Sequence, residues 1–188
     1  MLLFIDAEAA SRNVPRPREL EVLLAGVAAG DRDSLADLYS RTRTAVYALA
    51  LSILQQADDA QDVTQDAFVH IWEGAQGYRP RGKPMAWMLT IARNLALARL
   101  RERQRLAPLP EEAWDAIPAA PDMPYEDRQL LQEAMKKLDR QERQVVLLHA
   151  AAGLKHREIA ALLKLPLSTV LSKYRRALRK LRLSLEGR

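Results

Sequence analysis

The sequence predicts an all-α protein made of two small helical domains. Only 7 of its 188 residues are glycine, runs of aromatic or β-branched residues are few, and Ala, Leu, Arg and Glu are abundant. This composition favours helices on intrinsic propensity. With 48% hydrophobic residues, the chain can bury a core in one ordinary domain or in two small ones.

Residues 1–18 are expected to form a flexible N-terminal extension, because Pro15 and Pro17 lie within them. The apolar residues 1–5 are too few for the core of a signal peptide, and Asp6 follows at once. No uncharged apolar run approaches the roughly 20 residues that span a bilayer. We therefore expect a soluble, cytoplasmic protein without membrane insertion, and the absence of cysteine suits a reducing compartment.

The first domain is expected over residues 19–106 and contains four helices. An apolar stripe at helical spacing predicts the first helix, which Gly30 ends. Asp33 is expected to cap the second helix. The third and fourth helices are expected over residues 58–74 and 84–105, where apolar residues again recur at helical spacing.

A change in composition separates this domain from the next. Residues 107–127 contain five prolines and six acidic residues but no Lys or Arg, which predicts an extended interdomain linker. Helical periodicity restarts at Leu130. The second domain is therefore expected over residues 128–188.

Residues 154–170 carry the pattern of a helix-turn-helix. Ile159, Leu162 and Leu163 would pack the first helix inward, and residues 164–167 form the turn. The second helix is expected to start at Ser168 and to present a polar face that suits a major groove. That face contains Ser168, Thr169, Ser172, Lys173, Arg175, Arg176 and Arg179.

Such side chains can hydrogen-bond to base edges or neutralise phosphates, and Arg175 and Arg176 are the best candidates for contacts at or near the bases. The alternative is an amphipathic helix whose basic face is merely solvated.

Charge is segregated along the chain. Residues 79–105 contain eight Lys or Arg and one acidic residue, and residues 140–188 contain twelve and three. The rest of the chain is therefore net acidic, although the formal net charge is +5. This pattern predicts two basic surfaces for a polyanion and an acidic surface for a different partner. Together with the helix-turn-helix, it predicts docking on double-stranded DNA.

The third expected helix has an acidic face. Asp58, Asp62 and Asp66 recur every four residues, and no Lys or Arg lies between Ala57 and Glu73. Like charges at this spacing destabilise a helix by roughly a few tenths of a kcal/mol per pair. A basic partner that neutralises them is therefore a reasonable inference. An acidic face that is only solvated is the alternative.

The basic stretch from Tyr78 to Arg105 combines cations with aromatic residues, as single-strand binders do. Cationic side chains follow phosphates, and aromatic rings stack on or wedge against bases. Trp87 has a rival role as a core residue, because Trp87, Ile91 and Asn94 fall at near-helical spacing. A polar residue such as Asn94 in the middle of a helix is better explained by a contact than by propensity.

Three stretches in this order resemble a known family. Residues 58–72, residues 84–101, and residues 138–146 followed by the helix-turn-helix resemble the extracytoplasmic-function group of bacterial RNA polymerase sigma factors. The resemblance covers roughly residues 20–185. It implies a region 2 domain over 19–106, which binds core RNA polymerase and melts the minus-10 promoter element, and a region 4 domain over 128–188, which reads the minus-35 element.

The resemblance also implies roles for individual residues. Asp62, Gln65 and Asp66 would bind core RNA polymerase, and the face that starts at Ser168 would bind the minus-35 DNA. The melted minus-10 DNA would be held by Arg79, Arg81, Lys83, Trp87, Arg93 and Asn94. An anti-sigma factor is an expected further partner. The acidic linker would imitate nucleic acid inside the polymerase, or it would simply aid solubility.

Three positions depart from the family pattern. Lys155 replaces the usual helix-capping Ser or Thr, so a capping box with Glu158 is expected to be lost. Lys164 replaces the usual turn Gly and would cost on the order of 1 kcal/mol if the backbone there is left-handed. Leu171 stands where a basic residue is common. These changes leave the fold prediction intact.

Other function classes fit less well. His70, His149 and His156 are scattered, and neither a His-Glu-x-x-His pattern nor a phosphate-binding Gly loop occurs. We therefore expect no catalytic residues, no metal site, no cofactor and no enzyme activity. A conventional helix-turn-helix regulator of transcription remains the alternative function, although it would need neither the acidic helix nor the second basic segment.

Overall fold

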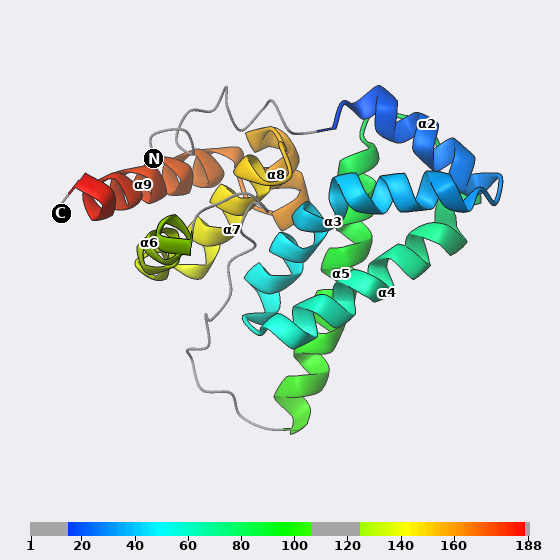
Figure 1. Ribbon diagram of the computed structural model, residues 1–188. Helices are drawn as coiled ribbons and strands as arrows, with labels where there is room; N and C mark the ends of the chain where they lie inside the picture. Colours follow the sequence, from blue (N-terminus) through cyan, green and yellow to red (C-terminus); the bar gives the residue numbers. More distant parts are fainter. Residues whose placement is uncertain (1–14, 107–124, 187–188) are drawn as a thin grey trace.

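The computed structural model describes residues 15–106 and 125–186, and these are helical throughout apart from short connections (Figure 1). The all-α prediction is thereby confirmed. Residues 1–14 and 107–124, which include most of the expected extension and linker, lie outside the described residues. The elements are α2 (Pro17–Ala28), α3 (Arg32–Leu54), α4 (Ala57–Gly74), the 3-10 turn η3 (Ala75–Gly77), α5 (Pro84–Leu106), α6 (Tyr125–Lys136), α7 (Arg140–Ala150), α8 (His156–Leu163) and α9 (Leu167–Glu186).

Some helix ends differ from the sequence prediction. Helix α2 begins at Pro17, within the expected extension, because proline is well suited to the first turn of a helix. The N-cap of α3 is Asp31 and not Asp33, since the Asp31 carboxylate accepts hydrogen bonds from the backbone N–H groups of Asp33 and Ser34 at 3.1 and 3.2 Å. Helix α6 begins at Tyr125, within the expected linker.

Helix α3 is the central element of the fold. Every residue from 48 to 54 is buried, which is typical of a helix that is covered on all sides. Helices α2, α4 and α5 pack around it, and α7 covers its C-terminal half (Figure 1). The position of α3 therefore sets the positions of both α4 and α5.

Helices α6 to α9 form the second part of the molecule, with α8 and α9 as the helix-turn-helix. Lys164 at the turn has a φ of +56°, so the left-handed backbone is present and its cost of about 1 kcal/mol applies. The expected loss of the capping box was only half right. The Lys155 side chain cannot accept a hydrogen bond, but the Glu158 carboxylate still accepts one from the Lys155 backbone N–H at 2.9 Å.

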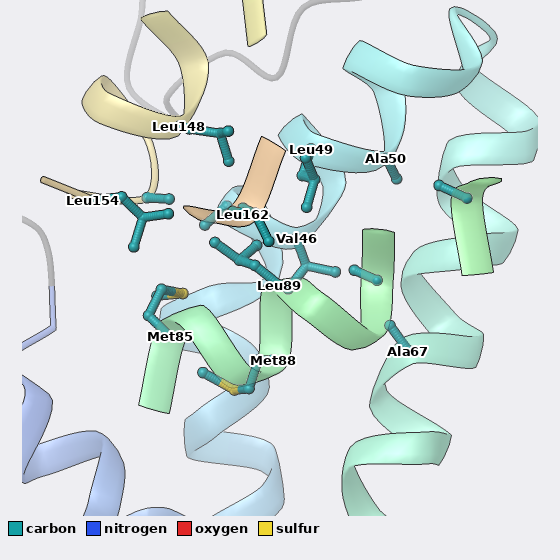
Figure 2. Packing of buried hydrophobic residues seen from close by; sticks show 14 of the residues in the cluster. Val46, Leu49, Ala50, Ala67, Met85, Met88, Leu89, Leu148, Leu154 and Leu162 are labelled. Carbon is teal, nitrogen blue, oxygen red and sulfur yellow. The ribbon is translucent and has the colours of Figure 1, made fainter. Parts of the chain in front are cut away.

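The two parts share the larger of two hydrophobic clusters, and the smaller cluster also joins Ala48 of α3 to the second part. Leu148, Leu154 and Leu162 of the second part point toward α3 and α5 of the first (Figure 2). The residues that they meet include Val46, Leu49, Met85 and Leu89.

Two hydrogen bonds join the same faces. The Arg140 guanidinium donates to the Ile53 carbonyl at 2.8 Å, and the Gln144 amide donates to the Ser52 carbonyl at 3.5 Å. The two sequence-defined units are therefore packed together and not held apart.

Candidate polymerase and DNA interfaces

Helix α4 exposes the three residues that the sequence assigns to polymerase binding. Asp62, Gln65 and Asp66 are all exposed. The opposite side of α4 is anchored in the core by Ala60, Val63, Ala67, Phe68 and Ile71. This division follows from the 3.6-residue period, which puts positions 62, 65 and 66 together on one face. We call Asp62, Gln65, Asp66 and Val69 the α4 face.

Val69 belongs to this face and was not predicted. It is an apolar side chain that is 55% exposed, and it lies three residues after Asp66 and four after Gln65, which makes it their neighbour on the helix. An apolar residue beside Asp66 and the amide of Gln65 gives this face apolar area that a partner can bury, in addition to its charge. The sequence signal was available, because Val69 interrupts the otherwise inward-facing apolar spacing of α4.

The acidic side of α4 is not free of cations. The Asp59 carboxylate contacts Arg99 of α5 at 3.2 Å and Arg103 of α5 at 2.9 Å. Arg99 also lies 3.8 Å from Asp62. No Lys or Arg of α4 itself neutralises its acidic residues, as expected, but arginines of α5 contact two of them. Asp59 ties α4 to α5, while Gln65 and Asp66 remain turned to solvent.

A basic loop precedes α5 and forms one side of a cavity. The cavity has a volume of about 420 Å³ and is lined by Gly77, Tyr78, Arg79, Arg81, Lys83, Ala86, Trp87 and Thr90. Four of the six residues predicted for minus-10 DNA thus meet at one place. The rings of Tyr78 and Trp87 pack at 4.9 Å, so the cavity combines an aromatic wall with three exposed cations.

Arg93 and Asn94 do not line this cavity. They lie further along α5, about one turn beyond Thr90, with Asn94 exposed and Arg93 half-buried. Trp87 packs against the core, which was one of the two roles considered for it, and it also lines the cavity; its contact with DNA stays a prediction. The lining is completed by four residues that were not predicted, namely Gly77, Tyr78, Ala86 and Thr90. The aromatic residue directly before Arg79 was the available signal for Tyr78.

Glu21 of α2 holds the basic loop. Its carboxylate accepts hydrogen bonds from the Gly82 backbone N–H at 2.8 Å and from the Tyr78 hydroxyl at 3.4 Å. Burial and then the charge of Glu21 raise the pKa of Tyr78, so the phenol stays protonated and donates at neutral pH. No local pattern links residues 61 positions apart.

The polar face of α9 contains two kinds of cation. Arg175 and Arg179 are exposed, and neither forms an ion pair with any described residue. Lys173, in contrast, has a side chain that is only 13% exposed and lies 3.1 Å from Asp139. Arg176 is intermediate, since it is exposed but lies 4.0 Å from Glu142. Ser168 and Ser172 are exposed and Thr169 is half-buried at the start of the same helix.

Helix α7 fixes α9 through two acidic residues. Asp139 and Glu142 form a capping box at the start of α7, with hydrogen bonds of 2.8 and 3.0 Å. Burial alone would raise the pKa of Asp139, but hydrogen bonds from the Glu142 backbone and from Lys173 outweigh it and lower the pKa. Glu142 is 1% exposed and contacts Lys180 of α9 at 2.7 Å.

A histidine pair lies between α7 and the helix-turn-helix. His149 and His156 stack at 4.7 Å, and both contact the ring of Tyr174 edge-on. Burial and the nearby His149 lower the pKa of His156. The pair therefore packs α7, α8 and α9 together, as expected for histidines with a structural role. Among the described residues, no three His, Asp or Glu side chains are placed to hold a metal ion.

The fold and these surfaces define a DNA-binding protein with separate acidic and basic faces, and comparisons with known proteins identify its family. Residues 38–106 match the family model described as sigma-70 region 2, and residues 128–181 match the model described as sigma-70, region 4. The chain belongs to the extracytoplasmic-function group of the sigma-70 family of RNA polymerase sigma factors.

Curated relatives agree with this assignment. The chain is 31% identical over 173 residues to the ECF RNA polymerase sigma factor SigK of Mycobacterium sp. (strain KMS), a match that covers 87% of this chain and 89% of the relative. It is also 31% identical over 180 residues to SigK of Mycobacterium ulcerans (strain Agy99), covering 92% and 96%.

Solved structures have the same fold. CnrH, solved in complex with the cytosolic domain of CnrY, has a TM-score of 0.61 and 26% identity, and the match covers 90% of this chain and 98% of CnrH. The sigma factor RpoE of Bartonella quintana, solved with the anti-sigma factor NepR, has a TM-score of 0.66 and 23% identity, covering 80% and 96%. Within the parts of the chain described here, no helix is both long enough and apolar enough to cross a membrane.

Proposed function

We propose that this sigma factor divides promoter recognition among three surfaces. The α4 face binds core RNA polymerase, the cavity beside the basic loop holds the melted minus-10 element, and the exposed face of α9 binds the minus-35 element. Residues 19–106 then carry the first two tasks, and residues 128–188 carry the third.

The cavity beside the basic loop is the observation that carries the proposal. Single-stranded DNA is bound by cations that follow its phosphates and by aromatic rings that contact its bases. Arg79, Arg81 and Lys83 supply the cations, and Tyr78 and Trp87 supply the rings. A regulator that binds only duplex DNA has no use for such a cavity on a domain separate from its helix-turn-helix.

The α9 surface has the chemistry of duplex recognition. Ser168 and Ser172 stand near the start of the helix, where side chains of a recognition helix reach base edges. Arg175 and Arg179 follow on later turns and are free to contact bases or phosphates. The ion pairs from Asp139 and Glu142 keep the helix in place, so this surface is ordered before DNA arrives.

An anti-sigma factor is the further partner that we propose. CnrH is 26% identical to this chain and was solved in complex with the cytosolic domain of CnrY, and RpoE was solved with an anti-sigma factor. The protein would meet such a partner, and the polymerase, in the cytoplasm. Its role is non-catalytic, in keeping with a family that is not an enzyme class.

Run-off transcription with purified core RNA polymerase tests this function. Promoter-specific transcripts should appear only when the protein is added, and they should disappear when Asp62 and Asp66 are both replaced by Lys. Retention of duplex binding by that variant would place the defect at the polymerase. Duplex binding by the unaltered protein without any such transcripts would instead favour a conventional helix-turn-helix regulator.

A further inference from the structure

Helix α2 lies outside the residues that match sigma-70 region 2, which begin at residue 38. It is nevertheless a fixed part of the fold, because Leu20, Leu24 and Val27 are buried in the main core. Glu21 stands next to the first of these anchors and reaches the loop that borders the cavity. A carboxylate on a firmly packed helix is thus directed at a loop of exposed residues.

The contact with the loop is made at two points. The Gly82 backbone N–H donates to the Glu21 carboxylate at 2.8 Å, and the Tyr78 hydroxyl donates to the same oxygen at 3.4 Å. These two donors stand at either side of Arg79 and Arg81. One oxygen therefore restrains both ends of the segment that carries two of the cations.

Two further contacts hold the loop: the Arg81 backbone hydrogen-bonds with the Tyr78 hydroxyl, and the Lys83 carbonyl accepts from the Trp87 backbone N–H at 3.2 Å. Residues 79–83 are all exposed and contain no helix. Gly82 has a φ of +69°, and a β-carbon there would meet nothing within 4 Å, so backbone conformation and not space requires glycine. Tyr78 carries the restraint onward, because its ring packs on Trp87 across the cavity wall.

We propose that Glu21 is a positioning residue for recognition of the melted minus-10 element. It orders the basic loop and the aromatic wall before DNA binds. Less conformational entropy is therefore lost when the DNA binds. Glu21 does not contact the DNA. The inference rests on the proposed function, since it assigns a support to the same cavity.

The role depends on an acceptor oxygen and not on negative charge. If Glu21 acted instead through its charge, by competing with phosphate for the cations of the loop, removal of that charge would tighten DNA binding. In Glu21→Gln the amide oxygen can still accept from Gly82 and Tyr78, whereas Glu21→Ala leaves both donors without it. The two substitutions thereby separate positioning from electrostatics.

The test uses holoenzyme assembled from core RNA polymerase and the full chain, and a forked promoter fragment whose minus-10 segment is single-stranded. We expect Glu21→Ala to weaken binding by about five- to tenfold, the equivalent of one lost hydrogen bond. The affinity of the Glu21→Gln variant for the fragment should stay within about twofold of that of the unaltered protein. Glu19→Ala is the matched control, since it removes an acid from the same helix that pairs with Arg41 and not with the loop.

Equal binding by Glu21→Ala and Glu19→Ala would overturn the inference, as would tighter binding by both Glu21 variants. Hydrogen exchange of the Gly82 amide in the free chain gives a second readout that needs no DNA. It should quicken in Glu21→Ala and stay slow in Glu21→Gln. Failure of the proposed function looks different, because replacement of Arg79 and Arg81 would then leave fork binding unchanged while the exchange result persists.

Discussion

Lys173 and Arg179 lie on the same helix and carry the same charge, yet their surroundings differ. Lys173 is held by Asp139 at 3.1 Å and is largely covered, while Arg179 is exposed. A cation that already has a partner gains little from a phosphate, since it must first give up that partner. The predicted minus-35 residues therefore divide into those that are free to contact DNA and those that hold the helix.

The salt dependence of duplex binding tests this division. Each phosphate contact contributes about 0.9 to the slope of log K against log salt concentration. Arg179→Ala should reduce the magnitude of that slope by about 0.9, the contribution of one phosphate contact. Lys173→Ala should leave the slope unchanged. Lys173→Ala should instead lower the melting temperature. A slope that falls equally in both variants would show that Lys173 contacts DNA after all.

His156 makes the stability of the helix-turn-helix depend on pH. Burial and then His149 lower its pKa below the ordinary value of 6.5, so the unfolded chain takes up a proton first as pH falls. The contribution to stability is thus intact above pH 6.5, decreases as pH falls toward the folded-state pKa, and levels off below it. Urea unfolding at several pH values should show this decrease, and His156→Phe should reduce it. An unchanged pH profile in the variant would contradict the assignment.

At the scale of elements, local sequence was sufficient for the helices and for the helix-turn-helix. Apolar residues at helical spacing marked α3, α4 and α5, and Lys164 marked the turn where left-handed backbone was found. Contacts between residues far apart in the sequence could not be predicted, because no local pattern accompanies them. Glu21 and Gly82 are 61 positions apart, and the pairing of Asp62 with Arg99 depends on how α4 packs on α5.

The packing of the second part on α3 was also beyond the sequence. Leu49 and Leu148 each fit an ordinary core position in a separate domain, and no pattern in the sequence shows that the two residues lie in the same cluster. The same limit applies to Lys173, which looks from the sequence like any other cation on the polar face of α9. Its pairing with Asp139 spans 34 positions.

Two aspartates on α4 should have different roles. Asp66→Asn should weaken binding to core RNA polymerase by about two- to tenfold, as expected for a charged contact, and leave the melting temperature unchanged. Asp59→Asn should lower the melting temperature, because it weakens the contacts with Arg99 and Arg103 that join α4 to α5. Titration of fluorescent protein with core polymerase and thermal unfolding measure the two effects. If Asp59→Asn weakened polymerase binding more than Asp66→Asn without loss of stability, the placement of the α4 face would be wrong.

In the whole molecule, the two proposed DNA surfaces belong to parts that share a hydrophobic core. The minus-10 and minus-35 elements lie about 25 base pairs apart, or roughly 85 Å of duplex. A compact chain of this length has a radius of gyration of about 16 Å. On the proposed assignment of the two surfaces, both elements are bound at once only when the contact of α7 with α3 opens. We therefore expect binding to the polymerase and promoter to supply contacts that replace this interface.

A reversible crosslink tests the need for opening. The chain has no cysteine, so two can be introduced without competing thiols. Gln55 lies two residues after Ile53, whose carbonyl accepts from Arg140, and a short cleavable crosslinker can join Gln55→Cys to Arg140→Cys. The crosslinked protein should fail in promoter-specific transcription and regain activity when the crosslinker is cut. Full activity while crosslinked would show that the closed arrangement is compatible with function.

Footprinting of holoenzyme on one promoter tests the division of tasks most directly. Permanganate detects unpaired thymines at the minus-10 element, and nuclease protection detects contact at the minus-35 element. We expect replacement of Arg79 and Arg81 with Ala to abolish permanganate reactivity and preserve upstream protection, and replacement of Arg175 and Arg179 with Ala to remove upstream protection. Loss of both signals in both variants, with core polymerase still bound, would contradict the assignment of separate surfaces to the two elements.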